Sequence, residues 1–161
     1  MQHTISVIVE NRAGVLTRVT GLFSRRGYNI ESLAVGQTDI AGVSRITIVV
    51  NGDEKVIEQV SKQLYKLIDV IKVVDLTEEE HVERGLILIK VHVDKSTRTE
   101  IIQVANIFRA RIIDMSPESF VVEATGTSSK LLALQEALRP YGIIEIARTG
   151  RIALARGKGG Y

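Results

Sequence analysis

The sequence predicts an α+β protein made of two βαββαβ units, each an antiparallel sheet with its helices on one face. Three observations lead to this fold class. Apolar residues alternate between the two-residue period of strands and the helical period of about 3.6 residues. The changes of period follow the order strand, helix, strand, strand, helix, strand. After a short polar stretch the same ferredoxin-like order recurs, so we expect two such units.

The first unit is expected over residues 1–76. A helical face follows directly after the first strand, since Val15, Val19 and Phe23 recur at four-residue spacing. Asp53 and Glu54 are typical of a helix N-terminus. The expected elements are a strand at 3–9, a helix from Val15, strands at 28–36 and 42–50, a helix from Asp53 and a strand at 70–76.

The second unit is expected over residues 86–161, after a polar, charged linker at 77–85. Its second helix is predicted to end at Pro140 and Gly142. The last seven residues, "ARGKGGY", are glycine-rich and basic, and we interpret them as a mobile tail. The expected elements are a strand at 86–93, a helix at 96–110, strands at 110–116 and 119–127, a helix at 128–142 and a strand at 143–149.

Composition restricts the classes of function. Lys and Arg number 21 against 19 Asp and Glu, which is too balanced for a dedicated nucleic-acid binder. With no cysteine, disulfides and thiolate zinc sites are excluded. The start "MQHTISVIVE" is too short for a signal peptide, and no apolar run reaches the roughly 18 residues of a membrane span. We therefore expect a soluble, cytoplasmic protein that binds no membrane.

Catalysis is poorly supported by the sequence. His3, His81 and His92 have no base, nucleophile or ligand at a recognisable spacing, and no P-loop or G-x-G-x-x-G occurs. "TEEEH" at 77–81 offers metal-ligand chemistry, but a solvated linker explains it better than a metal site. The strand "GVSRITIVV" lacks the aromatic residues on which an RNA-recognition motif stacks bases. We expect no catalytic residues, no bound metal and no nucleic acid.

The segments at residues 10–16 and 28–31 suggest a small-molecule site instead. Gly14 stands at the entry to the first helix, where free backbone amides favour an anion such as a carboxylate. Asn11 and Asn29 each offer a donor and an acceptor, as the two charged groups of an amino acid require. The same residues are also typical of ordinary turns and caps, so the pattern alone leaves both interpretations open.

Five segments carry a resemblance to a known family. They are "ENRAGVLTRVTGLFSRRGYNIESLAVG", "SRITIVVNGDEKVIEQVSKQLYKLIDVIKV", "HVERGLILIKV", "ANIFRARIIDMSPESFVVEATGTSSKL" and "EIARTGRIALARG". The first resembles the opening of an ACT domain. The whole series, which covers nearly the entire chain in order, is similar to the small regulatory subunits of acetolactate synthase (acetohydroxyacid synthase).

The resemblance implies a non-catalytic subunit in branched-chain amino acid biosynthesis. Such a subunit binds the catalytic (large) subunit of acetolactate synthase, raises its activity and confers feedback inhibition by valine. Thiamine diphosphate, magnesium and FAD then belong to the catalytic subunit, with no cofactor on this chain. It also implies a homodimer formed through the ACT domain. The effector, valine or a related branched-chain amino acid, is held between two ACT units.

Matching positions assign residues to these roles. The second unit has "HVDKSTRTEII" where the first has "VENRAGVLTRV", so we expect no second effector site. Arg18, Arg25 and Arg26 are candidates for contacting the catalytic subunit, or simply a solvated basic face. A stand-alone amino-acid sensor and a small enzyme remain as alternatives. The candidate effector-binding residues are Asn11, Gly14, Val15, Leu16, Asn29 and Ile30.

Overall fold

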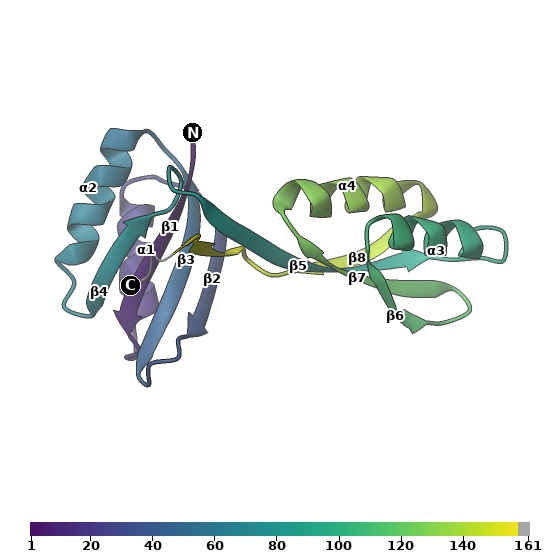
Figure 1. Cartoon of the computed structure of the whole chain (residues 1–161), viewed down its shortest axis with the longest axis horizontal. Helices are drawn as coiled ribbons and strands as arrows, with labels where there is room; N and C mark the ends of the chain where they lie inside the picture. Colours follow the sequence, from purple (N-terminus) through teal and green to yellow (C-terminus); the bar gives the residue numbers. More distant parts are fainter. Residues whose placement is uncertain (158–161) are drawn as a thin grey trace. The chain divides into compact units, whose positions relative to one another are not determined.

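A computed structural model of the chain describes residues 1–157, and its elements follow the predicted order (Figure 1). The fold class is confirmed: two βαββαβ units have antiparallel sheets and helices. By its contacts the chain divides into a first unit, Met1–Val82 together with the chain from Gly150 on, and a second unit, Glu83–Thr149. Part of the predicted mobile tail, residues 158–161, lies outside the described residues.

The first unit has a four-stranded antiparallel sheet in the order β2-β3-β1-β4. Side chains alternate along β1 and β3, so Ile5 and Val7 share one face with Ile48. Helices α1 and α2 bury Val19, Phe23 and other apolar residues against this face. The elements are β1 (Gln2–Glu10), α1 (Val15–Arg25), β2 (Ile30–Gln37), β3 (Val43–Asn51), α2 (Glu54–Tyr65) and β4 (Val70–Asp75).

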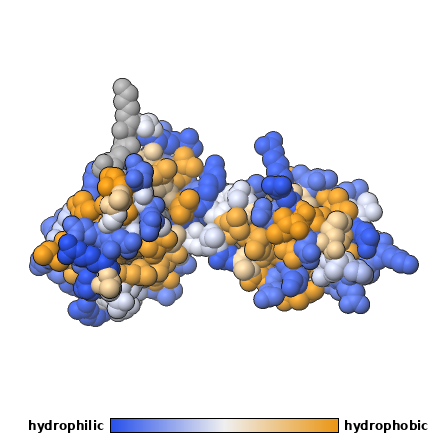
Figure 2. All heavy atoms as spheres, turned by 90° about the horizontal axis from the view of Figure 1, so that it is seen from below, coloured by the Kyte–Doolittle hydropathy of each residue, from blue (hydrophilic) through white to orange (hydrophobic). Residues whose placement is uncertain are grey.

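The second unit repeats this arrangement with the order β6-β7-β5-β8. Phe120 of β7 is fully buried in its core, with Ile89 of β5 and Ile101 of α3. Figure 2 shows apolar residues on the surface of this unit, and its exposed apolar side chains include Ile113 and Ile144. The elements are β5 (His81–His92), α3 (Arg98–Ile107), β6 (Arg111–Met115), β7 (Ser119–Gly126), α4 (Ser128–Leu138), the 3₁₀ turn η1 (Arg139–Tyr141) and β8 (Ile143–Arg148).

The division of the chain differs from the expected boundaries at two places. β5 begins at His81, so the second half of the expected linker 77–85 is a strand. After β8 a further strand that was not expected, β9 (Ile152–Ala155), belongs to the first unit and pairs with β5. The last residues of the expected second domain, from Gly150 on, therefore contribute to the first.

β9 covers the face of the first sheet that the helices leave open. Thr47 and Val49, which point away from the helices, are only 1% and 0% exposed. Ala153 is buried at 3%, whereas Ile152 and Leu154 on either side of it are 61% exposed. The strand therefore presents its small side chain to the sheet, and the central strands β1 and β3 are buried on both faces, whereas the edge strands β2 and β4 are not.

Candidate functional site

The loop between β1 and α1 gives the first helix an N-terminus without a side-chain cap. Gly14 is the N-cap residue, with φ 82°, and no side chain accepts a hydrogen bond from the first-turn amides. A Cβ at Gly14 would lie 3.1 Å from Nη1 of Arg18, in a backbone region that residues other than glycine rarely adopt. The amide of Val15 donates to the carbonyl of Arg12 at 3.3 Å, so the other amides of this first turn, which no side chain caps, are the candidates for an anion.

The buried residue Asp69 holds the β1–α1 loop in place. Its carboxylate is buried at 2% and lies 2.5 Å from Nη2 of Arg18 and 3.7 Å from Nε of Arg12. The Asp69 backbone carbonyl accepts a hydrogen bond from the amide of Glu10 at 2.8 Å. Asn11 is tied to the β2–β3 turn, since its amide donates to the carbonyl of Gly42 at 2.8 Å. The loop is therefore preorganised, and Arg18 holds it in place rather than projecting freely from α1.

Replacing Asp69 with asparagine should destabilise the first unit. The change leaves two arginines without their buried counter-charge, and we expect the free energy of unfolding to fall by about 2 kcal/mol, because both guanidinium groups retain solvent contact. Urea unfolding followed by circular dichroism measures this. Glu58→Gln is the matched control, since it removes an exposed ion pair with Lys62 and should cost less than about 0.5 kcal/mol. Equal effects of the two variants would contradict the role given to Asp69.

The structure does not bring the six candidate residues together within one chain. Glu10, which precedes Asn11, pairs with Val43, whereas Ile30 pairs with Val50 at the other end of β3. Seven residues of strand separate these two positions, or about 23 Å at about 3.3 Å per residue. Asn29 therefore lies far from Asn11, because the strand that follows it, β2, neighbours β3 and not β1.

The six residues also differ in exposure. Val15 is buried at 4% and contributes to the core, so only its backbone faces the loop. Leu16 is 40% exposed and offers an apolar side chain beside the accessible amides. Asn11 and Asn29 are exposed, and Ile30 is half-buried. The two groups, one at the β1–α1 loop and one at the start of β2, are both accessible from outside the chain.

In the corresponding loop of the second unit, between β5 and α3, the Asp94 side chain binds backbone amides of the loop. Oδ1 of Asp94 accepts hydrogen bonds from the amides of Ser96 at 2.8 Å and Thr97 at 3.0 Å, and from the Ser96 hydroxyl at 2.6 Å. These bonds, above all that from the Ser96 hydroxyl, hold the pKa of Asp94 below its usual value. Asp94 thus binds amides of the loop before α3, whereas the first turn of α3, like that of α1, has no side-chain cap.

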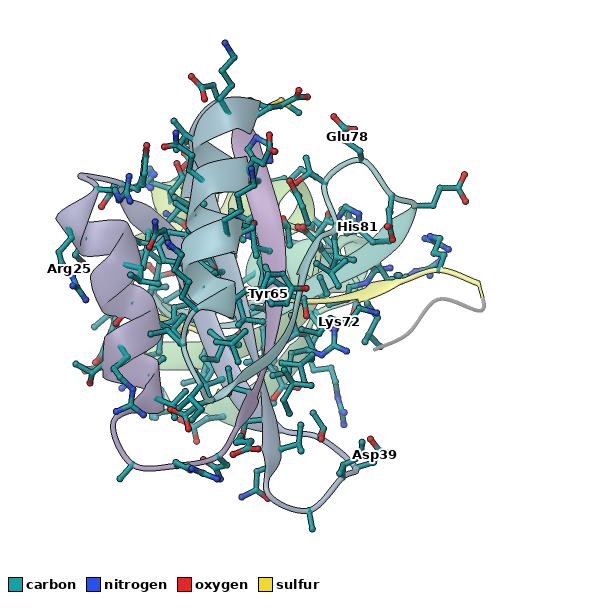
Figure 3. The ribbon with its side chains drawn as sticks, turned by 90° about the vertical axis from the view of Figure 1, so that its left-hand side faces the viewer. Arg25, Asp39, Tyr65, Lys72, Glu78 and His81 are labelled. Atoms are coloured by element: carbon teal, nitrogen blue, oxygen red, sulfur yellow. The ribbon has the colours of Figure 1, made fainter. Side chains whose placement is uncertain are left out.

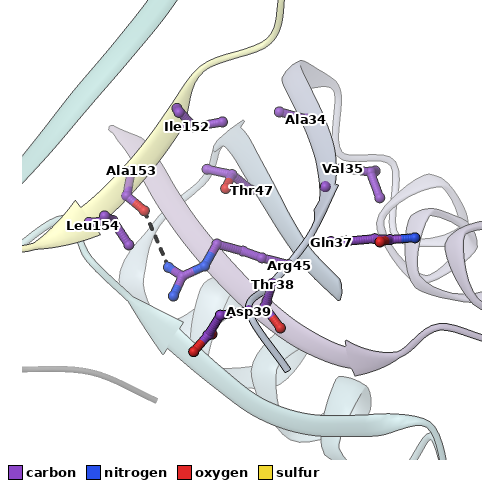
Figure 4. Close-up of a pocket in the computed structure, with 11 residues that line it drawn as sticks. Ala34, Val35, Gln37, Thr38, Asp39, Arg45, Thr47, Ile152, Ala153 and Leu154 are labelled. Atoms are coloured by element: carbon purple, nitrogen blue, oxygen red, sulfur yellow. Dashed lines mark hydrogen bonds between the residues drawn. The ribbon is translucent and has the colours of Figure 1, made fainter. Parts of the chain in front are cut away.

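β9 creates a further cavity that sequence reasoning missed. A space of about 460 Å³ lies between β2 and β9, lined by residues 34–39, Arg45, Thr47 and residues 152–154. Nη1 of Arg45 donates to the carbonyl of Ala153 at 3.2 Å (Figure 4). It also donates to the Ser6 hydroxyl at 3.1 Å. The lining residues include no histidine, so the cavity lacks an imidazole for acid–base chemistry. The only sequence signal was the alternation of large and small residues in "RIALA".

The histidines do not converge on one site. His3 is buried and bonded to Asp75, His81 bonds to the carbonyl of Glu79, and His92 is exposed (Figure 3 shows His81). Across residues 1–157 no cluster of His, Asp and Glu is arranged to hold a metal ion. Within the same residues no helix has the length and apolar character needed to cross a membrane.

Comparisons with known proteins agree with the resemblance seen in the sequence. Residues 5–72 match the family model "AHAS small subunit-like ACT domain", and residues 84–157 match "Small subunit of acetolactate synthase". A probable acetolactate synthase small subunit of Archaeoglobus fulgidus is 57% identical, with 98% of each chain covered. The small subunit of Mycolicibacterium smegmatis is 54% identical, covering 98% of this chain and 93% of the relative. The crystal structure of the Thermotoga maritima small subunit, 44% identical, matches with a TM-score of 0.90 over 99% of each chain.

Proposed function

The chain belongs to the family of acetolactate synthase small subunits, and on this premise we propose that it activates a catalytic subunit and makes that subunit sensitive to valine. The catalytic subunit would carry the active site and its thiamine diphosphate, magnesium and FAD. The observation that carries the valine part of the proposal is the uncapped N-terminus of α1. The relatives' names support a subunit role, and the geometry of this loop supports an effector with a carboxylate.

The effector's carboxylate would bind the first-turn amides of α1. No side chain of the protein caps this turn, and the partial positive charge of the helix N-terminus favours an anion there. Leu16 lies two positions after Gly14 and is exposed enough to contact an aliphatic side chain. Asn11 supplies an amide group that can accept from an ammonium or donate to a carboxylate. Together these groups suit a small aliphatic amino acid.

Two copies of the chain would be needed to complete the site. Asn29 and Ile30 lie at the opposite end of the sheet from Gly14, about 23 Å away by strand length, which is several times the length of valine. β2 is an edge strand, and a two-fold axis beside it would pair β2 with the β2 of a second copy in antiparallel fashion. Such pairing brings the start of one β2 towards the end of the partner's sheet that carries the β1–α1 loop. This supports the proposed homodimer.

Asn29→Ala tests the proposed effector site. A feedback effector that binds with a dissociation constant of about 0.1 mM has a binding free energy of roughly −5.5 kcal/mol. Loss of one or two charge-assisted hydrogen bonds should remove about 2 kcal/mol and raise the half-inhibitory valine concentration about thirtyfold. We expect the variant to activate the catalytic subunit normally while losing valine sensitivity.

The control for this experiment is Asn106→Ala, because Asn106 is exposed at the end of α3 in the second unit. It should leave both activation and valine inhibition unchanged. Full valine sensitivity in Asn29→Ala would remove Asn29 from the site. Failure of the wild-type chain to co-purify with a thiamine-diphosphate enzyme would instead favour a stand-alone amino-acid sensor.

A further inference from the structure

One edge of the first sheet carries a tyrosine side chain bonded to its backbone. β4 stands at the end of the strand order β2-β3-β1-β4, so the side of β4 that faces away from β1 is an edge of the sheet. Tyr65 is the last residue of α2 (Figure 3). Its hydroxyl accepts a hydrogen bond from the amide of Val73 at 2.9 Å and donates one to the carbonyl of Val73 at 3.1 Å. A single side chain therefore satisfies both polar backbone groups of one residue of β4.

The backbone groups of Val73 point outward from the sheet edge. In an antiparallel pair, positions that bond to the neighbouring strand alternate with positions that do not. The amide of Leu76 donates to the carbonyl of Thr4 at 2.9 Å, which places Leu76 at a bonded position. Val73 lies three residues earlier, opposite Val7, and is therefore at a position of the other kind. Its N–H and C=O face the edge, where the Tyr65 hydroxyl meets them.

The composition of β4 favours pairing with a further strand. Four of the six residues of "VIKVVD" are β-branched, as is typical of strands. An edge with free N–H and C=O groups is a template for the strand of another chain. Lys72 and the register shift beside it protect the first part of β4, since charges and bulges on an edge disfavour pairing. The Tyr65 hydroxyl protects the part that follows.

We propose that Tyr65 keeps the β4 edge from pairing with the β4 edge of a second copy of the chain. In an antiparallel pair about a two-fold axis, the Val73 residues of the two copies would exchange two N–H···O bonds. The Tyr65 hydroxyl takes the place of the second copy, because it accepts from the amide and donates to the carbonyl. A sheet that pairs at both edges adds copies without limit. With β4 closed, a pairing through β2 ends at two copies.

The second copy is the partner that fits this edge because the strand is compatible with itself. A pair centred on Val73 sets Lys72 opposite Val74 and Ile71 opposite Asp75 of the other copy. No like charges then stand opposite each other, which would destabilise the pair. The apolar residues of both strands also continue one another across the axis. Only the bonds between Tyr65 and Val73 stand in the way of this arrangement at its centre.

Tyr65→Phe tests the proposal by sedimentation velocity of the full-length chain at increasing concentration. Tyr65 is 51% exposed, so the variant should fold normally, which circular dichroism verifies. Without the hydroxyl, no hydrogen bond holds the ring over Val73. We expect the mass of the wild-type chain to stay constant and that of the variant to rise to at least about twice the wild-type mass. A variant that keeps the wild-type mass would overturn the proposal.

The outcome is independent of the homodimer proposed through β2. A monomeric wild-type chain would contradict that homodimer, and growth of Tyr65→Phe from one copy to two would still support the role of Tyr65. A dimeric wild-type chain with an unchanged variant would have the opposite meaning. The two proposals can therefore fail separately.

Two further substitutions, each added to Tyr65→Phe, locate the new contact. Ile71→Glu places a carboxylate opposite Asp75 of the second copy and should restore the wild-type mass, because like charges directly opposite destabilise a strand pair. Ile68→Glu makes the same change at a 90% exposed side chain in the turn before β4 and should leave the larger assembly intact. Equal effects of the two substitutions would show that the copies associate elsewhere, and the proposal would be wrong.

Discussion

Replacing Gly150 with alanine is expected to release β9 from the first unit. A Cβ at this position would lie 2.1 Å from the backbone oxygen of Leu33 and 2.5 Å from its carbonyl carbon. These are backbone atoms of β2, which is paired with β3 and cannot move aside as a flexible side chain would. The segment from Gly150 on must therefore shift, at a cost of about 3 kcal/mol, so detachment becomes roughly a hundredfold more frequent.

Limited trypsin digestion followed by mass spectrometry measures this release. In the native chain the amide of Arg151 donates to the Ser32 hydroxyl at 2.8 Å, and the amide of Arg156 donates to the carbonyl of Glu80 at 2.8 Å. These two bonds restrain the backbone at both trypsin cleavage points. Cleavage after these arginines should accelerate in Gly150→Ala. The control is Gly36→Ala, where a Cβ meets nothing within 4 Å. If the two variants were cleaved at the same rate, the close contact at Gly150 would not hold β9.

The repeating order of elements was predictable because each element carries its own local signal. The apolar stripe of α1 and the alternation along β1 each reflect burial on one face, and both appear in the core as expected. Element ends were less predictable. β2 begins at Ile30 rather than at residue 28, since Gly27, with φ 75°, and the following turn occupy the preceding positions. The residue at which a strand begins or ends depends on backbone hydrogen bonds, which the amino-acid sequence does not reveal directly.

β9 could not be predicted because its stability comes from distant contacts. Four residues are too few for a clear period, and the glycines beside them indicate a loop. One of these contacts is made by the guanidinium of Arg45, which donates to the carbonyl of Ala153 across 108 positions of sequence. The pairing of His3 with Asp75 is similar, since the two residues stand 72 positions apart. No spacing rule connects such residues.

The candidate effector site was partly readable from sequence. The glycine at the start of α1 and the absence of a side-chain cap there follow from local chemistry. The placement of Asn29 does not, because it depends on which strands are neighbours in the sheet. The order β2-β3-β1-β4 puts β3 between β2 and β1 and sends the start of β2 to the far end. Because of this separation, the proposed effector site must take Asn11 from one chain and Asn29 from a second copy. Mixing two variants tests this directly.

Mixing two variants that each bind valine only weakly is expected to restore tight valine binding. Each proposed site takes Asn11 from one chain and Asn29 from its partner, so Asn11→Ala and Asn29→Ala homodimers should each lose both sites of the dimer. A heterodimer of the two carries both substitutions at one site and neither at the other. Random exchange in an equal mixture makes half of the dimers heterodimers, and about a quarter of all sites become intact.

Calorimetric titration with valine after co-refolding the two variants gives the decisive reading. We expect a stoichiometry of about a quarter of the wild-type value with wild-type affinity, because the restored sites are chemically complete. Mixing Asn11→Ala with the Asn11→Ala/Asn29→Ala double variant controls for refolding and should restore nothing. Absence of binding in the first mixture, with heterodimers verified by native mass spectrometry, would show that the two asparagines do not share a site across chains. The roughly 23 Å between the two groups within one chain makes restoration by a single chain impossible, so recovery would require the second copy.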